Sequence, residues 1–161
     1  EQTGLFFYTS NIDKALVARK KELQDNVIPS SNSSLAKALF LLGDYYDNEK
    51  YFELSETMLN NMKSFVLQYG TYYSNWAQLL EMNVNQPHEI AIVGKNAENI
   101  RKEMMTYFIP NALFIGGKTE SNLELLEGKL IEGETYIYVC QNRVCNMPVK
   151  TVGEALKLIF K

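Results

Sequence analysis

Side chains suited to binding or catalysis are concentrated in residues 25–34 of this 161-residue chain, a polar stretch that leads into a predicted helix. It contains Asp25, then a proline and five short polar residues that end at Ser34. Such side chains favour turns and helix N-caps because they can satisfy free backbone N–H groups. One cap oxygen near Ser33 would suffice, so the remaining hydroxyl, amide and carboxylate groups could serve a ligand. The free N–H groups and the dipole of a helix start favour an oxygen-rich partner.

A ligand pocket at this helix start would draw on four side chains: Arg19, Asp25, Ser30 and Asn32. Arg19 could pair with Asp25 and leave the other two facing a hydroxyl-bearing ligand such as a sugar, and aromatic side chains nearby could stack on its ring. These aromatic residues are Phe6, Phe7 and Tyr8. The simpler interpretation is a loop that bonds its own backbone, as Ser and Asn commonly do. No pair of carboxylates stands out for glycosidase chemistry, so catalytic residues stay unassigned.

Cys140 and Cys145 form a second candidate site, one at a predicted strand end and one in the loop beyond it. A turn could bring their β-carbons within range of a local disulfide or a reactive redox pair. The alternative is two reduced structural cysteines. We favour this alternative because Arg143 is the only basic residue nearby that could stabilise a thiolate.

Other motifs do not support a cofactor or a metal. His88 is the only histidine, and two cysteines cannot fill a four-ligand structural zinc site. Residues 116–119 read Gly-Gly-Lys-Thr, but the first glycine of a P-loop would fall on Ala112. Residues 93–96 offer one glycine where a dinucleotide turn needs several. A serine triad also lacks support, because only one histidine could take part. We therefore expect no cofactor and no metal.

Composition excludes several partner classes. A net charge of −3, from 16 basic and 19 acidic residues, leaves no basic footprint for nucleic acid. No apolar run approaches the length of a membrane span. Two cysteines are too few for the disulfide framework of a small secreted domain, so we expect a reducing, cytoplasmic location. The first residue is Glu and no leader follows, which suggests a fragment whose targeting signals would lie elsewhere.

The first half of the chain reads as a β-hairpin followed by helices. Residues 4–9 and 15–19 are strand-prone and flank a predicted turn, so we expect a short hairpin. Apolar residues at helical spacing predict an antiparallel helix pair around residues 47–49. They are Leu35, Leu39, Leu42 and Tyr46, then Met58, Leu59, Met62, Phe65, Val66 and Tyr69. A third helix holds Trp76 and ends before Pro87, and its aromatics and the Met residues are expected to be core.

The pattern changes after Pro87 to a small α/β subdomain. Apolar strands at 89–93 and 112–115 flank an amphipathic helix, and a third strand spans 136–140. Continuous apolar strands predict a three-stranded parallel sheet with right-handed crossovers. A last helix starts with a capping box at 151–154. Its expected buried face is Val152, Leu156, Ile159 and Phe160. The predicted fold class is mixed α+β and α/β, with domains at 1–87 and 88–161.

Four separated groups of residues, taken in order, resemble one protein family. They are Gly4, Phe6, Phe7 and Thr9; Arg19, Lys21, Leu23, Asp25, Pro29, Ser30, Asn32 and Ser33; Ile109-Pro110-Asn111; and residues 138–149, which read Tyr-Val-Cys-Gln-Asn-Arg-Val-Cys-Asn-Met-Pro-Val. The groups cover nearly the whole chain. They resemble the C-terminal part of the thioredoxin-domain-containing proteins related to spermatogenesis-associated protein 20 and bacterial YyaL.

This resemblance implies a thioredoxin-like domain, then an α/α toroid of the six-hairpin glycosidase and sugar-epimerase kind, in the missing N-terminal part of the same chain. Residues 1–87 would close the toroid and contribute to a carbohydrate-type ligand pocket, and residues 88–161 would be an appended subdomain. The isolated piece is expected to be inactive and to self-associate through uncovered apolar helix faces. The alternative is a non-catalytic structural or interaction module. Such a module would be redox-linked through the thioredoxin-like domain and the pair Cys140 and Cys145.

Overall fold

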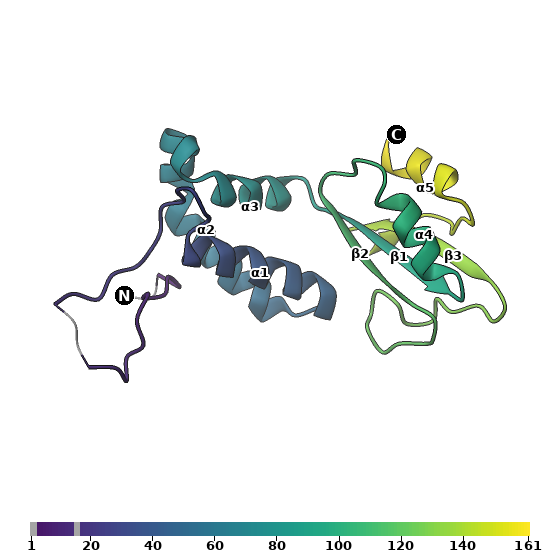
Figure 1. The fold of residues 1–161 in the computed structure, drawn as a ribbon, viewed down its shortest axis with the longest axis horizontal. Coiled ribbons are helices and arrows are strands. Elements are labelled where there is room, and N and C mark those ends of the chain that lie inside the picture. Colours follow the sequence, from purple (N-terminus) through teal and green to yellow (C-terminus); the bar gives the residue numbers. More distant parts are fainter. Residues whose placement is uncertain (1–2, 15–16) are drawn as a thin grey trace. The chain divides into compact units, whose positions relative to one another are not determined.

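A computed structural model describes residues 3–14 and 17–161, and the chain divides into two compact units, Glu1–Val84 and Asn85–Lys161 (Figure 1). The sequence analysis placed the boundary between residues 87 and 88, and the first strand begins at His88. The described residues form five α-helices and one four-stranded sheet, so the fold is mixed α and β.

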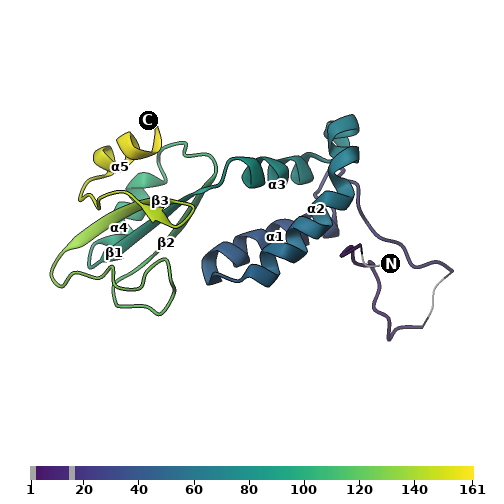
Figure 2. The same ribbon diagram turned by 180° about the vertical axis from the view of Figure 1, so that it is seen from behind.

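The first unit is helical. Its elements are α1 (Ser31–Tyr46), α2 (Glu49–Tyr69), a short 3-10 helix η1 (Gly70–Tyr72) and α3 (Ser74–Val84). Helices α1 and α2 lie side by side in both opposite views (Figures 1 and 2), and this confirms the predicted pair. Asp47 ends α1 in a left-handed conformation, with φ 49°, and its N–H donates to the carbonyl of Gly43. Trp76, Met58 and Met62 are buried in the core of this unit, as predicted.

The buried face of α1 differs from the predicted stripe of large apolar residues. Leu39 is buried, but Leu35, Leu42 and Tyr46 are exposed. Phe40 and two small residues take their place: Phe40 is 2% exposed, Ala36 is fully buried, and the ring of Phe52 from α2 lies 3.1 Å from the point where a Cβ on Gly43 would sit. The prediction therefore chose the wrong large residues of α1, and it overlooked the small residues, which carry little hydrophobic signal.

The predicted N-terminal β-hairpin is wrong within the residues that the structure describes. Residues 3–14 and 17–30 contain no strand, and one backbone hydrogen bond, from Tyr8 N–H to the Lys20 carbonyl at 2.9 Å, joins the two sides. Ala15 and Leu16 of the expected return strand lie outside the described residues. An isolated two-stranded hairpin is marginal in water. Here the side chain of Asn32 also accepts from the N–H of Phe6 and donates to its carbonyl. These two backbone groups are therefore not available for hydrogen bonds to a neighbouring strand.

The second unit is a sheet with helices on one face. Its strands are β1 (His88–Gly94), β2 (Ala112–Gly117), β3 (Thr135–Gln141) and β4 (Val144–Cys145), in the order β2-β1-β3-β4. Helix α4 (Ala97–Met104) connects the parallel strands β1 and β2 and confirms the predicted β-α-β unit. The all-parallel sheet is wrong, because β3 is antiparallel to β1. The connection from β2 to β3 forms turns rather than a crossover helix, and an antiparallel return needs none.

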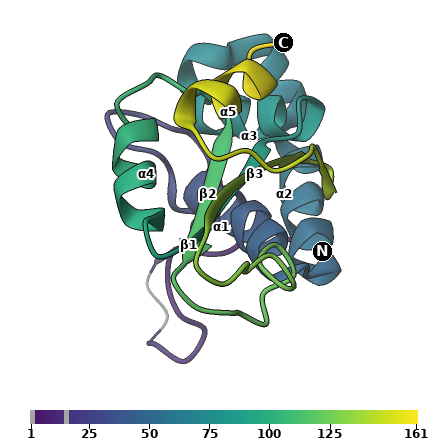
Figure 3. The same cartoon turned by 90° about the vertical axis from the view of Figure 1, so that its right-hand side faces the viewer.

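The two faces of the sheet are covered differently. Helices α4 and α5 (Val152–Ile159) pack on the face that carries Ile90 and Val139 (Figure 3). The turns between β2 and β3 cover the other face through Leu126, which packs on Ala91 and Val93. The capping box at Thr151 is confirmed. Phe160 was expected to be buried, but it is 57% exposed because α5 ends at Ile159.

Candidate functional site

Asp25 is the centre of the polar cluster at the start of α1. Asp25 is only 2% exposed, and its Oδ1 accepts hydrogen bonds from Ser30 N–H at 2.8 Å and the Ser33 hydroxyl at 2.6 Å. Oδ2 accepts from Asn75 N–H, in the first turn of α3, at 2.9 Å. A single carboxylate therefore satisfies free N–H groups at two helix starts and ties the N-terminal segment to both.

Ser30 and Asn32, the predicted ligand contacts, are also buried and bonded to backbone. Ser30 is the N-cap of α1, where its hydroxyl accepts from Ser33 N–H at 3.1 Å and donates to the Leu23 carbonyl at 3.2 Å. Asn32 holds the backbone of Phe6 at 2.7 and 2.9 Å and donates to the Glu22 carbonyl at 2.8 Å. In this unit these two side chains hydrogen-bond to the backbone of the loop and of the helix start. This agrees with the simpler of the two interpretations of the sequence, a loop that bonds its own backbone.

Arg19 does not join the cluster. It is exposed, donates to the carbonyl of Thr9 at 3.0 Å and lies 4.2 Å above the ring of Phe7. Asp25 meets Ser30, Ser33 and Asn75 instead, so the predicted pairing of Arg19 with Asp25 is not formed. Arg19 lines a separate open hollow of about 460 Å³ together with exposed aromatic rings. These rings belong to Phe6, Phe7 and Tyr8.

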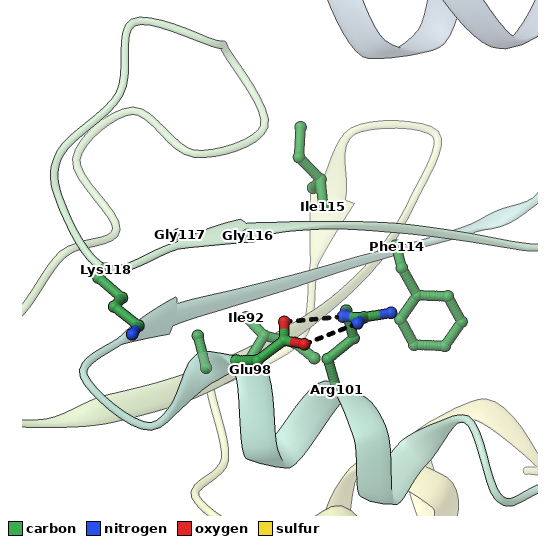
Figure 4. Close-up of a pocket in the computed structure, with 9 residues that line it drawn as sticks. Ile92, Glu98, Arg101, Phe114, Ile115, Gly116, Gly117 and Lys118 are labelled. Carbon is green, nitrogen blue, oxygen red and sulfur yellow. Dashed lines mark hydrogen bonds and ion pairs between the residues drawn. The ribbon is translucent and has the colours of Figure 1, made fainter.

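A cleft of about 450 Å³ lies between α4 and β2 (Figure 4). Arg101 and Glu98 form a two-bonded ion pair beside it, at 2.8 and 3.1 Å, and this hydrogen bonding lowers the pKa of Glu98. Lys118 lies at the end of β2, where Gly116 and Gly117 are extended strand rather than a phosphate-binding loop. Glu98 pairs with Arg101, so Lys118 is the remaining charged side chain of the lining.

Cys140 and Cys145 are joined by a disulfide between β3 and β4. They are directly opposite in the antiparallel register, at the base of a two-residue turn formed by Asn142 and Arg143 with φ 51° and 63°. Two left-handed residues are typical of a tight hairpin turn. The favoured interpretation of two reduced cysteines is therefore wrong here. The preference for reduced cysteines rested on thiolate stabilisation, whereas here the register of a tight turn places the two residues opposite each other.

The two cysteines differ in access to solvent. Cys140 is 1% exposed, whereas Cys145 is exposed on the short strand β4. On the other side of β3, Glu89 of β1 is the register partner of Cys140, so the two side chains lie on the same face of the sheet. The disulfide thus has one accessible end and one buried end beside a carboxyl group.

Glu89 is a residue that the sequence analysis missed. It is 4% exposed; Oε1 accepts from Arg143 N–H at 3.3 Å, and Oε2 has no hydrogen-bond partner. The guanidinium of Arg143 pairs with Glu124 at 3.1 Å, from the turns between β2 and β3. The sequence did contain a signal, because Glu89 is a charged residue within a predicted buried apolar strand. Charged side chains are rarely buried, so one in such a strand is a candidate for a special role.

Comparisons with protein-family models, with curated proteins and with solved structures found no match. The family resemblance therefore stays a prediction. Over the described residues, no group of acidic, histidine and cysteine side chains could hold a metal ion. No helix there has both the length and the apolar character that crossing a bilayer requires.

Proposed function

We propose that this chain is a thiol–disulfide redox module, in which the Cys140–Cys145 disulfide exchanges electrons with a dithiol partner. The observation that carries the proposal is the pairing of an exposed cysteine with a buried one across a tight hairpin. The partner class is a thioredoxin-like dithiol domain, of the kind that the family resemblance implies.

A purely structural role explains this disulfide less well. The bond closes a loop between residues only five positions apart, which is worth about 2 kcal/mol in the chain-entropy account. The hairpin is also held by its turn and by Asn146 N–H, which donates to the Val139 carbonyl at 3.0 Å. The low cysteine content predicts a reducing compartment, where disulfides are usually transient and take part in redox chemistry.

The exchange balances as a two-electron transfer. A thiolate of the partner attacks Sγ of Cys145, the bond to Cys140 breaks, and its electron pair leaves on Cys140 Sγ, which takes up a proton. The second thiolate of the partner then attacks the mixed disulfide, and Cys145 leaves and is protonated. The chain ends with two thiols and the partner with one disulfide.

Trapping the mixed disulfide tests this proposal. The oxidised chain would be mixed with a reduced thioredoxin whose second active-site cysteine is replaced by serine, and free thiols would be blocked with iodoacetamide. We expect a one-to-one adduct on Cys145 with Cys140 alkylated, as located by peptide mass spectrometry. The same mixture in urea is the matched control. An adduct that forms only in urea would contradict the proposal.

A second candidate function rests on the open aromatic hollow. We propose that residues 1–87 close an α/α toroid in the longer protein, and that Phe6, Phe7, Tyr8 and Arg19 there face a carbohydrate-type ligand. Exposed aromatic rings next to a charged hydrogen-bond donor suit sugar recognition. A thermal-shift screen of neutral sugars on a chain that includes the toroid, with Phe7→Ala as the comparison, tests this idea. Equal shifts in both proteins would contradict it.

A further inference from the structure

We propose that the carboxyl group of Glu89 exchanges a proton with Cys140 during each redox cycle. This inference rests on the proposed function and assigns the group that handles the proton at the buried sulfur. In reduction, Cys140 leaves as a thiolate in a closed environment and must gain a proton. In oxidation, the Cys140 thiol must lose that proton before its sulfur can attack.

The sheet register places Glu89 beside Cys140. Glu89 and Cys140 are paired residues of the antiparallel strands β1 and β3. Side chains in such a pair point to the same face, with their β-carbons about 5 Å apart. Cys140 faces Cys145 across its other edge, so the disulfide lies between the exposed strand β4 and the carboxyl group.

The hydrogen bonding of Glu89 leaves one oxygen available for this role. Oε1 accepts from the backbone N–H of Arg143, and Oε2 is buried with no partner. Buried polar atoms are nearly always hydrogen-bonded, and the exceptions include redox and catalytic groups. The anchored oxygen holds the carboxyl group in place, and the other oxygen can carry the proton.

The surroundings limit the other groups that could take this role. On the β2 side, the register partner of Glu89 is the apolar Leu113. The hairpin turn contributes the guanidinium of Arg143, which is paired with Glu124 from the turns that cover this face. Tyr138, two residues before Cys140 on β3, donates its hydroxyl to the Lys129 carbonyl at 2.9 Å, and burial raises the pKa of its phenol. Glu89 is therefore the one of these groups that both neighbours Cys140 in the register and has a buried oxygen without a partner.

The two half-reactions balance at these atoms. When a dithiol attacks Cys145, the S–S bond breaks toward Cys140 Sγ, and the protonated carboxyl of Glu89 delivers its proton to that sulfur. The Cys140 thiol and the Glu89 carboxylate that result are the groups from which the reverse reaction starts. In the reverse direction, the carboxylate takes the Cys140 proton as Cys140 Sγ attacks the sulfur of the mixed disulfide and the partner thiolate leaves.

Rates of reduction by dithiothreitol as a function of pH test the assignment. The oxidised, folded chain would be compared with Glu89→Gln and with Glu127→Gln, an exposed glutamate in the turns that cover the same face, after circular dichroism and thiol counting show that each variant is folded and oxidised. Ionisation of dithiothreitol affects all three proteins equally, so the ratio of rates isolates the side chain. We expect Glu89→Gln to be slower by about 100-fold at acidic pH, as for loss of a general acid, with the ratio approaching one at alkaline pH. Glu127→Gln should match the wild type throughout.

The outcomes separate the two proposals. If the folded wild-type chain is not reduced at all, the proposed redox function fails. If the wild type is reduced but Glu89→Gln has the same rate, or is slower by one constant factor at every pH, the proton role of Glu89 is overturned and the redox function stands. Should Glu89→Gln not fold, Glu89→Asp carries the test, because it keeps a carboxyl group one methylene shorter. Slower reduction at acidic pH, with the ratio to the wild type approaching one at alkaline pH, would support the role, and an unchanged rate or one constant factor at every pH would overturn it.

Discussion

Replacing Asp25 with alanine should strongly destabilise the helical unit, because this carboxylate satisfies three buried donors. Without it, the Ser33 hydroxyl can turn fully to the Ser30 carbonyl, which already lies at 3.0 Å. The N–H groups of Ser30 and Asn75 have no such substitute. Each buried, unsatisfied donor costs about 1–3 kcal/mol, so we expect Asp25→Ala to lower the free energy of unfolding by about 4 kcal/mol.

Urea unfolding followed by tryptophan fluorescence measures this effect. Trp76 is the only tryptophan; it is fully buried in the same unit, and its Nε1–H donates to the Leu23 carbonyl at 2.8 Å. Asp25→Asn keeps one acceptor oxygen and should lose about half as much, and Asp13→Ala, at an exposed position, is the control. A loss within about 0.5 kcal/mol for Asp25→Ala, as for surface positions, would refute this assignment and revive a ligand role for Asp25.

Two further predictions concern the last helix and the exposed helix faces. Thr151→Ala should cost about 1 kcal/mol in urea unfolding of the sheet unit, because it removes the N-cap of α5. The side-chain hydrogen bond of Thr151 lowers the pKa of Glu154 in the folded protein. The stabilisation from this bond is therefore present above the unfolded-state pKa of Glu154 and is lost as pH falls through its folded-state pKa. The free energy of unfolding of Thr151→Ala should accordingly change less with pH in the acidic range than that of the wild type. The isolated chain should self-associate through apolar side chains such as Leu67, which is 73% exposed, and Leu67→Lys should weaken this association in sedimentation velocity. A clean monomer over a wide concentration range would count against the toroid proposal.

Local signals in the sequence predicted the elements that depend on neighbouring residues. The capping box joins Thr151 to Glu154, and the β-α-β unit follows from a short apolar strand and an amphipathic helix. Pairing partners far along the chain were not predictable in this way. Phe6 is not in a strand because its backbone is hydrogen-bonded to the side chain of Asn32, 26 residues later. The third donor to Asp25 is the N–H of Asn75, 50 residues away.

The candidate redox site shows the same limit. The direction of β3 depends on the turns that connect it to β2, and local composition does not encode the direction of strand pairing. Without that direction, the register that places Glu89 beside Cys140 could not be derived. Cys140 and Cys145 were recognisable as a pair from their spacing, but their different exposure and the carboxyl group next to Cys140 could be found only from the sheet.

Redox titration of the folded chain tests the central claim most directly. The protein would be equilibrated in dithiothreitol buffers of graded potential, its thiols counted by alkylation and mass spectrometry, and the folding of the sheet unit followed by circular dichroism. We predict a reversible two-electron transition in which Cys140 and Cys145 appear together as thiols while the sheet stays folded. A pair that stays oxidised until the sheet unfolds, or two thiols that never form a disulfide under oxidising conditions, would contradict it.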